Sequence, residues 1–292
     1  MRDDDKFLQE SFVDFKKIWL SPAKKDPAMG VSPMLRQAPP KKEEYPMNEK
    51  IETLQKWIDE SQRIVFFGGA GVSTESGIPD FRSTDGLYNQ SYDYPPETII
   101  SASFFKQNPG EFYRFYRDRM IYQGAKPNAA HLKLAELEKA GKLSAIVTQN
   151  IDGLHQAAGS KIVHELHGST LRNYCPRCGK KYPLDFIMKG EGRQLPYCDT
   201  PKCNGIVRPD VVLYEEALDM DVMEAAVEAI GKADMLIIGG TSLVVYPAAG
   251  LVNYYNGKKL VVVNKSATGM DWRADLAINE PIGEVFSQII VR

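Results

Sequence analysis

A short apolar run that ends in glycines is the feature that most constrains the fold of this 292-residue chain. Ile64–Phe67 is typical of a strand buried on both faces, and it stops at the small residues Gly68–Gly71. Glycines let a backbone turn tightly and approach a ligand closely. Ser73 and Thr74 follow and are suited to capping a helix. Strand, glycine turn and helix start together predict a pocket for a pyrophosphate.

The segment after this turn bears on whether the turn binds a ligand or merely connects two elements. Glycine-rich turns after strands are common, and this one departs from the strict G-x-G-x-x-G pattern. However, Gly77–Arg82 brings an acid, an aromatic ring and a guanidinium together with no apolar period. Such a cluster would be odd as a plain connection and would suit a flap over a bound ligand.

Later apolar runs repeat the pattern of a buried strand followed by polar residues. Ala145–Thr148 precedes Gln149–Asp152, Met235–Gly239 precedes Thr241 and Ser242, and Leu260–Val263 precedes Asn264. Such polar residues can be simple turn formers, but in open α/β sheets the ligand contacts also lie beyond the carboxyl ends of the strands. Helical runs alternate with these strands. We therefore predict an α/β fold with a doubly wound parallel, Rossmann-like sheet.

The four cysteines lie in one segment, as Cys175, Cys178, Cys198 and Cys203. Two pairs at this spacing indicate a four-thiolate zinc site, whereas disulfides or free thiols are the weaker alternative in a reducing compartment. Four protein ligands would close the metal's coordination shell, so the predicted Zn²⁺ is structural. It would hold a small inserted zinc-ribbon module at residues 172–208.

Composition limits the partners and the location. Hydrophobic residues make up 43% and charged residues 25% of the chain, and the net charge is −2, which gives no reason to expect direct nucleic-acid binding. No apolar stretch approaches the ~20 residues that span a bilayer, and the amino-terminal stretch lacks the apolar region of a signal peptide. We expect a cytoplasmic monomer with no membrane partner.

Residues 1–46 differ in character from the rest. Asp5–Leu20 could form one amphipathic helix, and a Pro- and Lys-rich stretch follows it. This extension could be flexible, could dock on a partner or on the catalytic body, or could be fused ahead of an original start at Met47. From Met47 onward, a helical face leads into the first strand. Further on, Asn108 and Asn128 are suited to starting helices, and an aromatic stripe beginning at Phe112 is expected to be core.

Three motifs together resemble the sirtuins, the NAD-dependent protein-lysine deacylases, in their bacterial form. They are Gly69–Ser73 running into Gly77–Arg82, the sequence T-Q-N-I-D-G-L-H at Thr148–His155, and the His-Gly pair at His167. The resemblance covers residues 47–292, which would form the catalytic domain. It implies a small helical module at residues 83–127 beside the NAD site.

The resemblance also implies the roles of individual residues. His167 would be the general base and Asn150 would assist catalysis, whereas His131, His155 and His164 are expected to be structural. The peptide substrate would pair with Val211, Val212 and Leu213. NAD would contact Ala70, Thr74, Phe81, Arg82, Gln149, Ile151, Asp152, His167, Thr241, Ser242, Asn264 and Ile282.

The implied reaction consumes NAD and an acyl-lysine protein or peptide, and it releases nicotinamide, the free lysine and O-acyl-ADP-ribose. A mono-ADP-ribosyltransferase or an NAD glycohydrolase on the same scaffold is the main alternative. An ordinary nicotinamide dehydrogenase and a non-enzymatic NAD-sensing module fit the residues less well.

Two positions bear on substrate choice. Sirtuins that prefer succinyl groups pair a Tyr with an Arg three residues later, whereas Tyr113 is followed at that offset by Tyr116, which favours acetyl or longer uncharged groups. A second register that uses Tyr116 and Arg119 remains open. The family's Phe-Gly-Glu is replaced by Tyr-Glu-Glu at residues 214–216, so the missing glycine leaves the shape of the peptide groove open.

Overall fold

The computed structural model describes residues 47–81, 86 and 92–292 of the chain. The predictions for residues 1–46 and for Arg82 therefore lie outside the described residues. In the described part, no helix is long and apolar enough to cross a membrane.

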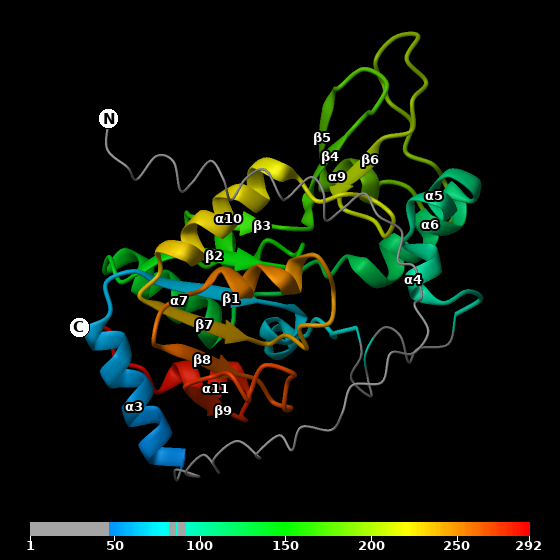
Figure 1. The fold of residues 1–292 in the computed structure, drawn as a ribbon. Coiled ribbons are helices and arrows are strands. Elements are labelled where there is room, and N and C mark those ends of the chain that lie inside the picture. Colours follow the sequence, from blue (N-terminus) through cyan, green and yellow to red (C-terminus); the bar gives the residue numbers. More distant parts are fainter. Residues whose placement is uncertain (1–46, 82–85, 87–91) are drawn as a thin grey trace, which may run out of the picture. The chain divides into compact units, whose positions relative to one another are not determined.

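A six-stranded parallel sheet forms the larger part of the structure (Figure 1). Its order is β3-β2-β1-β7-β8-β9, and every neighbouring pair is parallel. This confirms the predicted doubly wound fold. The strands are β1 (Ile64–Gly68), β2 (Leu143–Thr148), β3 (Val163–Glu165), β7 (Met235–Gly239), β8 (Leu260–Val263) and β9 (Leu276–Ile278).

The direction of strand addition reverses between β1 and β7. The chain moves from β1 outward through β2 to β3, and it later returns to place β7 on the other side of β1. In doubly wound sheets, the crevice outside the carboxyl ends of the strands at such a reversal is where ligands bind. Gly68 pairs with Thr148 on one side and with Gly239 on the other, so the three polar loops that follow these residues start side by side.

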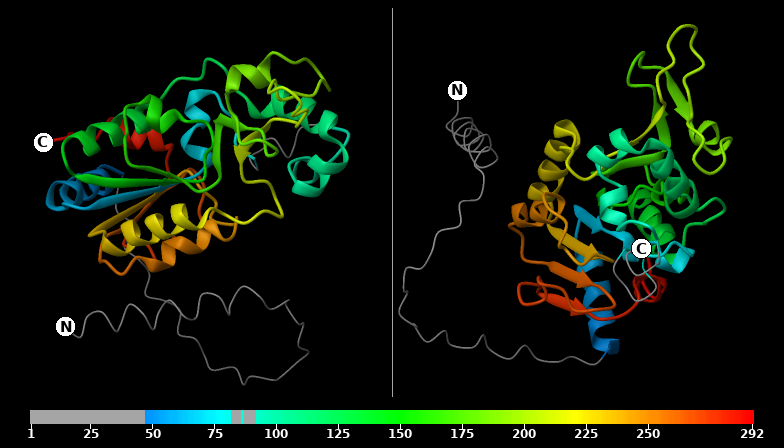
Figure 2. Two further views of the ribbon diagram at one scale, coloured as in Figure 1. Left: turned by 90° about the horizontal axis from the view of Figure 1, so that it is seen from above. Right: turned by 90° about the vertical axis from the view of Figure 1, so that its right-hand side faces the viewer.

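Helices cover both faces of this sheet (Figure 2). Along β1, Ile64 and Phe66 point to one core, whereas Val65 and Phe67 point to the other, because successive side chains of a strand alternate. The first core is closed by α3 (Met47–Glu60), α7 (Ala129–Lys139) and α11 (Ile282–Ser287), and the second by α10 (Met220–Lys232) and η5 (Ala248–Tyr254).

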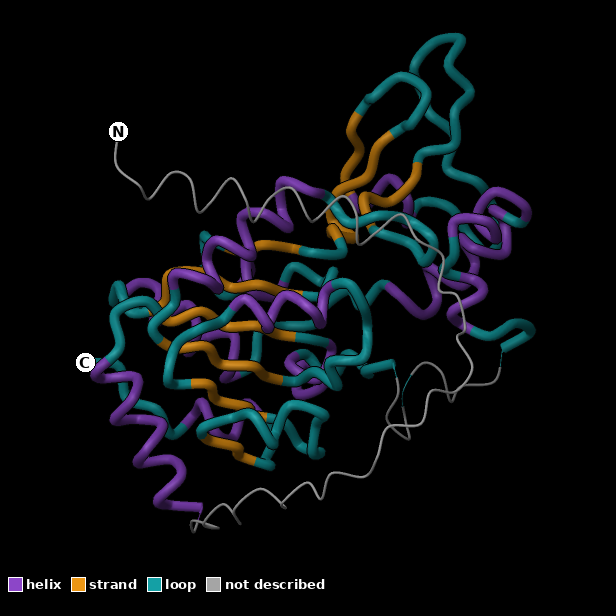
Figure 3. Tube along the Cα trace, viewed as in Figure 1, coloured by secondary structure: helices purple, strands orange, loops and turns teal. Residues whose placement is uncertain are grey.

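A second sheet is separate from the first in the tube drawing of Figure 3. It is antiparallel in the order β5-β4-β6. Its strands are β4 (Gly168–Tyr174), β5 (Lys181–Pro183) and β6 (Arg208–Val211), and α9 (Leu184–Met188) follows β5. The segment before α7 is helical, with α4 (Pro96–Ile99), α5 (Ala102–Gln107), α6 (Pro109–Phe115) and a π-helical turn, η4 (Tyr116–Met120).

The helical segment and the cysteine segment share one hydrophobic core. The predicted aromatic stripe is confirmed as core, because Phe112, Tyr113, Phe115 and Tyr116 are all buried. They belong to the same cluster as three of the cysteines and as Val211. The two predicted modules therefore pack as one body.

Two predictions about helix starts have different outcomes. Asn128 caps α7 as predicted, and its side-chain amide also donates to Val72 O (2.7 Å) and Ser76 Oγ (3.1 Å). The helix predicted at Ser73 and Thr74 is wrong. Two short 3₁₀ turns, η1 (Ala70–Val72) and η2 (Thr74–Ser76), replace it and end at Gly77, whose φ of +82° breaks the helical path. The loop backbone, rather than the first turn of a long helix, therefore faces the cavity.

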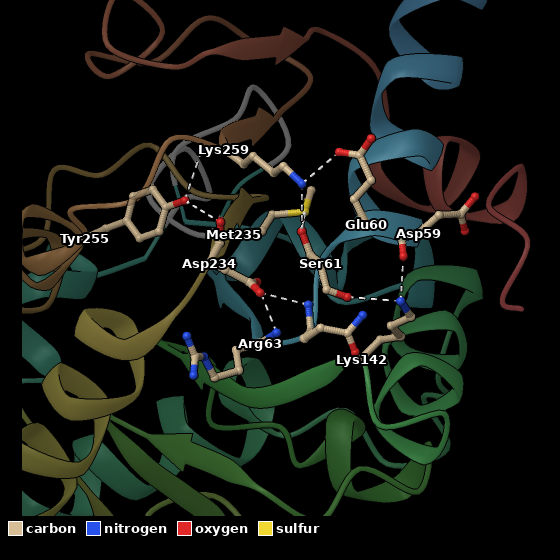
Figure 4. A network of polar contacts seen from close by, with 10 residues as sticks. Asp59, Glu60, Ser61, Arg63, Lys142, Asp234, Met235, Tyr255 and Lys259 are labelled. Carbon is tan, nitrogen blue, oxygen red and sulfur yellow. Dashed lines mark hydrogen bonds and ion pairs between the residues drawn. The ribbon is translucent and has the colours of Figure 1, made fainter.

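A polar network joins the amino ends of β1, β7 and β8 to the end of α3 (Figure 4). The carboxylate of Asp234 accepts hydrogen bonds from the backbone N–H of Gln62 (2.8 Å) and Arg63 (3.0 Å). On the other side, Lys142 Nζ donates to the carbonyls of Asp59 (2.6 Å) and Ser61 (3.0 Å). These bonds fix the turn between α3 and β1, and thereby the entry of the central strand.

We expect Asp234→Ala to destabilise the protein by roughly 1–3 kcal/mol, because two backbone donors lose a charged acceptor. Urea unfolding followed by circular dichroism measures the loss. Glu228→Ala is the matched control, since it removes only an exposed carboxylate that faces Lys232 on α10 and should cost less than about 0.5 kcal/mol. Equal effects of the two substitutions would contradict this role of Asp234.

Candidate active site

A cavity of about 740 Å³ lies beyond the carboxyl ends of β1, β2 and β7. The loops that follow these strands line it together with residues of the smaller body, which consists of the helical segment before α7 and the cysteine segment with its sheet. Among these residues are Val211–Glu216. The volume is in the range of pockets that enclose a whole small-molecule ligand. It lies where the sequence predicted the ligand site.

Two glycine turns form the floor of this cavity through close backbone contact. Gly71 N donates to Gly240 O (2.8 Å), and Gly69 N donates to Gly239 O (3.2 Å). A Cβ atom on Gly71 would lie 2.9 Å from Gly240 Cα, and Gly240 itself has a φ of +57°. Both positions therefore require glycine, and the approach leaves the backbone of residues 70–71 facing the ligand space.

A chain of side-chain hydrogen bonds joins the first two sequence motifs. Asn150 Nδ2 donates to Ser73 Oγ (3.1 Å), and Ser73 Oγ donates to Asp152 Oδ2 (2.7 Å). The other carboxylate oxygen of Asp152 accepts from Leu154 N (2.9 Å). Ser73 is only 1% exposed, so the chain is shielded from solvent at its centre. An amide and a carboxylate are thus held in fixed orientations at one wall of the cavity.

His167 lies between β3 and β4 and lines the same cavity. Its Nδ1 is 2.9 Å from Gln149 O, and because a carbonyl can only accept, Nδ1 carries the proton in the neutral ring. Nε2 is then the basic nitrogen. Burial lowers the pKa of His167 below its ordinary value, and the bond to the Gln149 carbonyl opposes that change in part. The ring is therefore neutral and basic near pH 7.

The remaining histidines lie away from the cavity lining. The rings of His131 and His155 contact each other in a tilted arrangement with centroids 4.8 Å apart, and burial lowers their pKa values to about 4 and about 3. His164 is on β3, and burial lowers its pKa too. None of the three lines the cavity.

Most of the predicted site residues meet at the cavity, although they come from distant parts of the chain. Thr74 does not line it, because its side chain is exposed and its hydroxyl donates to Gly71 O. Ile282 does not line it either, because it is buried in the core against Gly239. The predicted residues that do line the cavity are Ala70, Phe81, Gln149, Asn150, Ile151, Asp152, His167, Val211, Val212, Leu213, Thr241, Ser242 and Asn264.

Sequence reasoning missed several parts of the wall, among them Ser73 and Val245–Pro247. Ser73 was considered only as a helix cap, yet it is the centre of the hydrogen-bond chain; its place inside the first motif was the available signal. Val245–Pro247 also lines the cavity, and its place shortly after the β7 turn could have indicated this.

The two registers considered for acyl preference differ in position. Tyr113 is outside the cavity lining, and its hydroxyl donates to Val207 O. Tyr116 and Arg119 both line the cavity. Of the two registers, the second is the one that lies at the ligand space.

The four cysteine sulfurs converge. All lie within 4.8 Å of one another, and the Cys175–Cys203 and Cys178–Cys198 sulfurs are each 3.5 Å apart, which is too long for a disulfide. Four thiolates around a tetrahedral Zn²⁺ at ~2.3 Å would be about 3.8 Å apart. The four side chains therefore fit one zinc ion with a closed coordination shell.

Comparisons with known proteins agree with this geometry. A model of the Sir2 family matches residues 69–247. The NAD-dependent protein deacetylase of Clostridium perfringens is 60% identical over 247 residues, covering 84% of this chain and all of the relative, and that of Clostridium acetobutylicum is 59% identical over 244 residues, covering 83% and 98%.

Solved structures agree as well. One structure of Sir2 with a p53 peptide and NAD⁺ has a TM-score of 0.71 at 40% identity, and covers 81% of this chain and 95% of the other. Another, with deacetylated p53 peptide and 3′-O-acetyl-ADP-ribose, has a TM-score of 0.75 at 41% identity, with coverages of 82% and 96%. The family model and these relatives, together with the motifs that line the cavity, show that the chain belongs to the Sir2 family, the sirtuins, in its bacterial form.

Proposed function

We propose that this protein is an NAD-dependent protein-lysine deacetylase. The observation that carries the proposal is a neutral, basic His167 in the same cavity as the Asn150–Ser73–Asp152 chain. This chain matches nearly the whole length of relatives that are named NAD-dependent protein deacetylases. This favours deacetylation over ADP-ribosyl transfer to protein or NAD hydrolysis.

The residues of the cavity fit NAD. Ala70 and Gly71 line the cavity, and the contact of Gly71 with the Gly240 backbone excludes a side chain at position 71, so backbone groups are available to a pyrophosphate there. We assign Asp152 and Ile151 to the nicotinamide carboxamide, Gln149 and Asn150 to the ribose, and Thr241, Ser242 and Asn264 to the adenosine half. Phe81 would shield the reacting face from water. Thr74 and Ile282 remain proposed contacts of NAD although neither lines the cavity, and Arg82, which lies outside the described residues, remains a proposed contact of the pyrophosphate.

When bound, NAD would supply an ADP-ribosyl group that leaves nicotinamide and, with the addition of one water, takes the acyl group from the lysine, which is released as the free amine. His167 Nε2 would take a proton from a ribose hydroxyl, so that this oxygen can attack the acyl carbon. The Gln149 carbonyl keeps the proton on Nδ1 and so keeps Nε2 free for this role. Gln149 is itself fixed by the bond from its Nε2 to Thr241 Oγ1 (3.1 Å), which links the base to the β7 turn.

The peptide substrate would add a strand at the outer edge of β6, with Val211, Val212 and Leu213 as its partners. β6 is at the edge of its sheet, and Val212 N donates to His167 O (3.0 Å), so the proposed peptide site is bonded to the proposed base. We further propose that the protein acts as a monomer in the cytoplasm, where reduced cysteines can hold zinc, and that it binds no nucleic acid.

The zinc site is proposed as a structural element of the smaller body. Cys175, Cys198 and Cys203 belong to the hydrophobic cluster that also contains the aromatic stripe of α6. The Tyr182 hydroxyl lies within hydrogen-bond distance of Cys198 Sγ (3.0 Å) and of Asp199 Oδ1 (2.5 Å), so its one proton is shared between the thiolate and this carboxylate beside the metal site. The metal would thereby hold the sheet that carries β6.

We expect His167→Ala to reduce deacetylation at least about 100-fold, the usual contribution of a general base, while NAD affinity changes little. Release of acetyl groups from a peptide measures the first, and calorimetric titration with NAD the second. His164→Ala is the matched control, because His164 lies three residues away and outside the cavity, and it should keep near-full activity. Deacetylation by His167→Ala close to that of the unmodified protein would refute the assignment.

We expect one zinc per chain, and we expect Cys178→Ser to lose the metal and to lower the melting temperature by several degrees. Metal analysis after dialysis against a chelator, with thermal unfolding, tests this without reference to activity. Tyr197→Phe, which alters an exposed side chain of the same segment, should change neither quantity. A protein without zinc, or a Cys178→Ser variant with full zinc content, would overturn the proposal.

A further inference from the structure

The loop after β6 contains a residue in a backbone conformation that its side chain disfavours. Glu215 has a φ of +76°, in the left-handed region that glycine occupies readily and other residues rarely. A non-glycine residue stays in this region only when surrounding contacts hold it there. The position lines the cavity next to the proposed peptide site.

The contacts that hold Glu215 come from the first turn of α5. One carboxylate oxygen accepts from Ser103 N (2.9 Å), and the other accepts from Ser103 Oγ (2.9 Å). The main chain beside it is paired as well, because Ala102 N donates to Tyr214 O (3.0 Å) and Tyr214 N donates to Ile100 O (3.0 Å). The carboxylate thus fastens the loop to the helical segment across more than a hundred residues of sequence.

The neighbouring residues of the same loop are held by different partners. Glu216 forms an ion pair with Arg208 of β6 and accepts from Leu213 N (2.9 Å). Val212 N is bonded to His167 O. The backbone of residues 211–216 is therefore held at two places, at β6 and His167 on one side and at α5 on the other, where Glu215 adds its carboxylate to the main-chain bonds of Tyr214.

We propose that Glu215 is a positioning residue for the acyl-lysine peptide, acting through the backbone of Val211–Leu213. This inference rests on the proposed deacetylase function. A peptide that adds a strand is recognised mainly through main-chain bonds, so its affinity depends on how rigidly the receiving backbone is held. We call the two bonds between the Glu215 carboxylate and Ser103 the clamp. The clamp compensates for the absent glycine and holds the backbone that receives the peptide in one conformation.

The test compares substitutions at position 215 in steady-state kinetics with an acetyl-lysine peptide and NAD. Glu215→Ala loses the clamp but keeps the strained conformation, and should raise the KM for peptide roughly fivefold to twentyfold. The KM for NAD and kcat should change less than about twofold. Glu215→Gly also loses the clamp but relieves the strain, so it should be affected less than Glu215→Ala.

Glu215→Gln separates the clamp from the charge. Its amide oxygen can accept from Ser103 N and its amide nitrogen can donate to Ser103 Oγ, so this variant should retain a peptide KM close to that of the unmodified protein. Ser103→Ala should have a smaller effect than Glu215→Ala and should add little to it in the double variant, because both remove the same contact. Hydrogen exchange at the amides of Ala102 and Tyr214 should accelerate in Glu215→Ala and stay slow in Glu215→Gln.

The outcomes are distinguishable. If the unmodified protein does not deacetylate the peptide, the proposed function fails. If it does and Glu215→Ala keeps its peptide KM, or if Glu215→Gln behaves like Glu215→Ala, the positioning role is wrong. An equal rise in the KM for NAD would also contradict it, because a general disturbance of the fold would then explain the result.

Discussion

The close approach of two backbone turns at the carboxyl ends of β1 and β7 is the constraint on which the site depends. The bond from Gly71 N to Gly240 O fixes the distance between them, and a side chain at either glycine would push the turns apart. Ser73 follows one turn and Thr241 follows the other. Ser73 contacts Asn150 and Asp152, and Thr241 contacts Gln149, whose carbonyl holds His167. The base and the polar wall of the cavity are therefore placed by the same pair of glycine turns.

The substrate side of the cavity depends on a different core. The helical segment before α7 and the cysteine segment after His167 are far apart in sequence, yet they bury one cluster of side chains together. Arg117 reinforces this packing, because its guanidinium donates to the carbonyls of Ile187, Gly192 and Gln194. A loss of the cysteine cluster would thus disturb the packing of α5, of α6 and of the strand edge proposed to bind the peptide, as well as the metal site.

The sequence allowed the large sheet and most of the site to be predicted, since both follow from local patterns. Buried strands such as Ile64–Phe67 are visible as apolar runs, and Asn150, Asp152 and Thr241 follow directly at strand ends. The short turns in place of a helix at Ser73 could not be predicted from local sequence. The Ser73 hydroxyl donates a hydrogen bond to Asp152, which lies 79 positions away, and does not cap a helix. The clamp at Glu215 was hidden for the same reason, as its partner Ser103 lies 112 positions earlier.

The most direct measurement of the central claim is mass spectrometry of an acetyl-lysine peptide incubated with the protein and NAD. The presence of His167 and Asp152 in one cavity lining predicts deacetylated peptide, nicotinamide and O-acetyl-ADP-ribose in equal amounts. Nicotinamide released without deacetylated peptide would indicate a glycohydrolase or a transferase instead. An absence of NAD consumption with any of several acyl chains would contradict the account altogether.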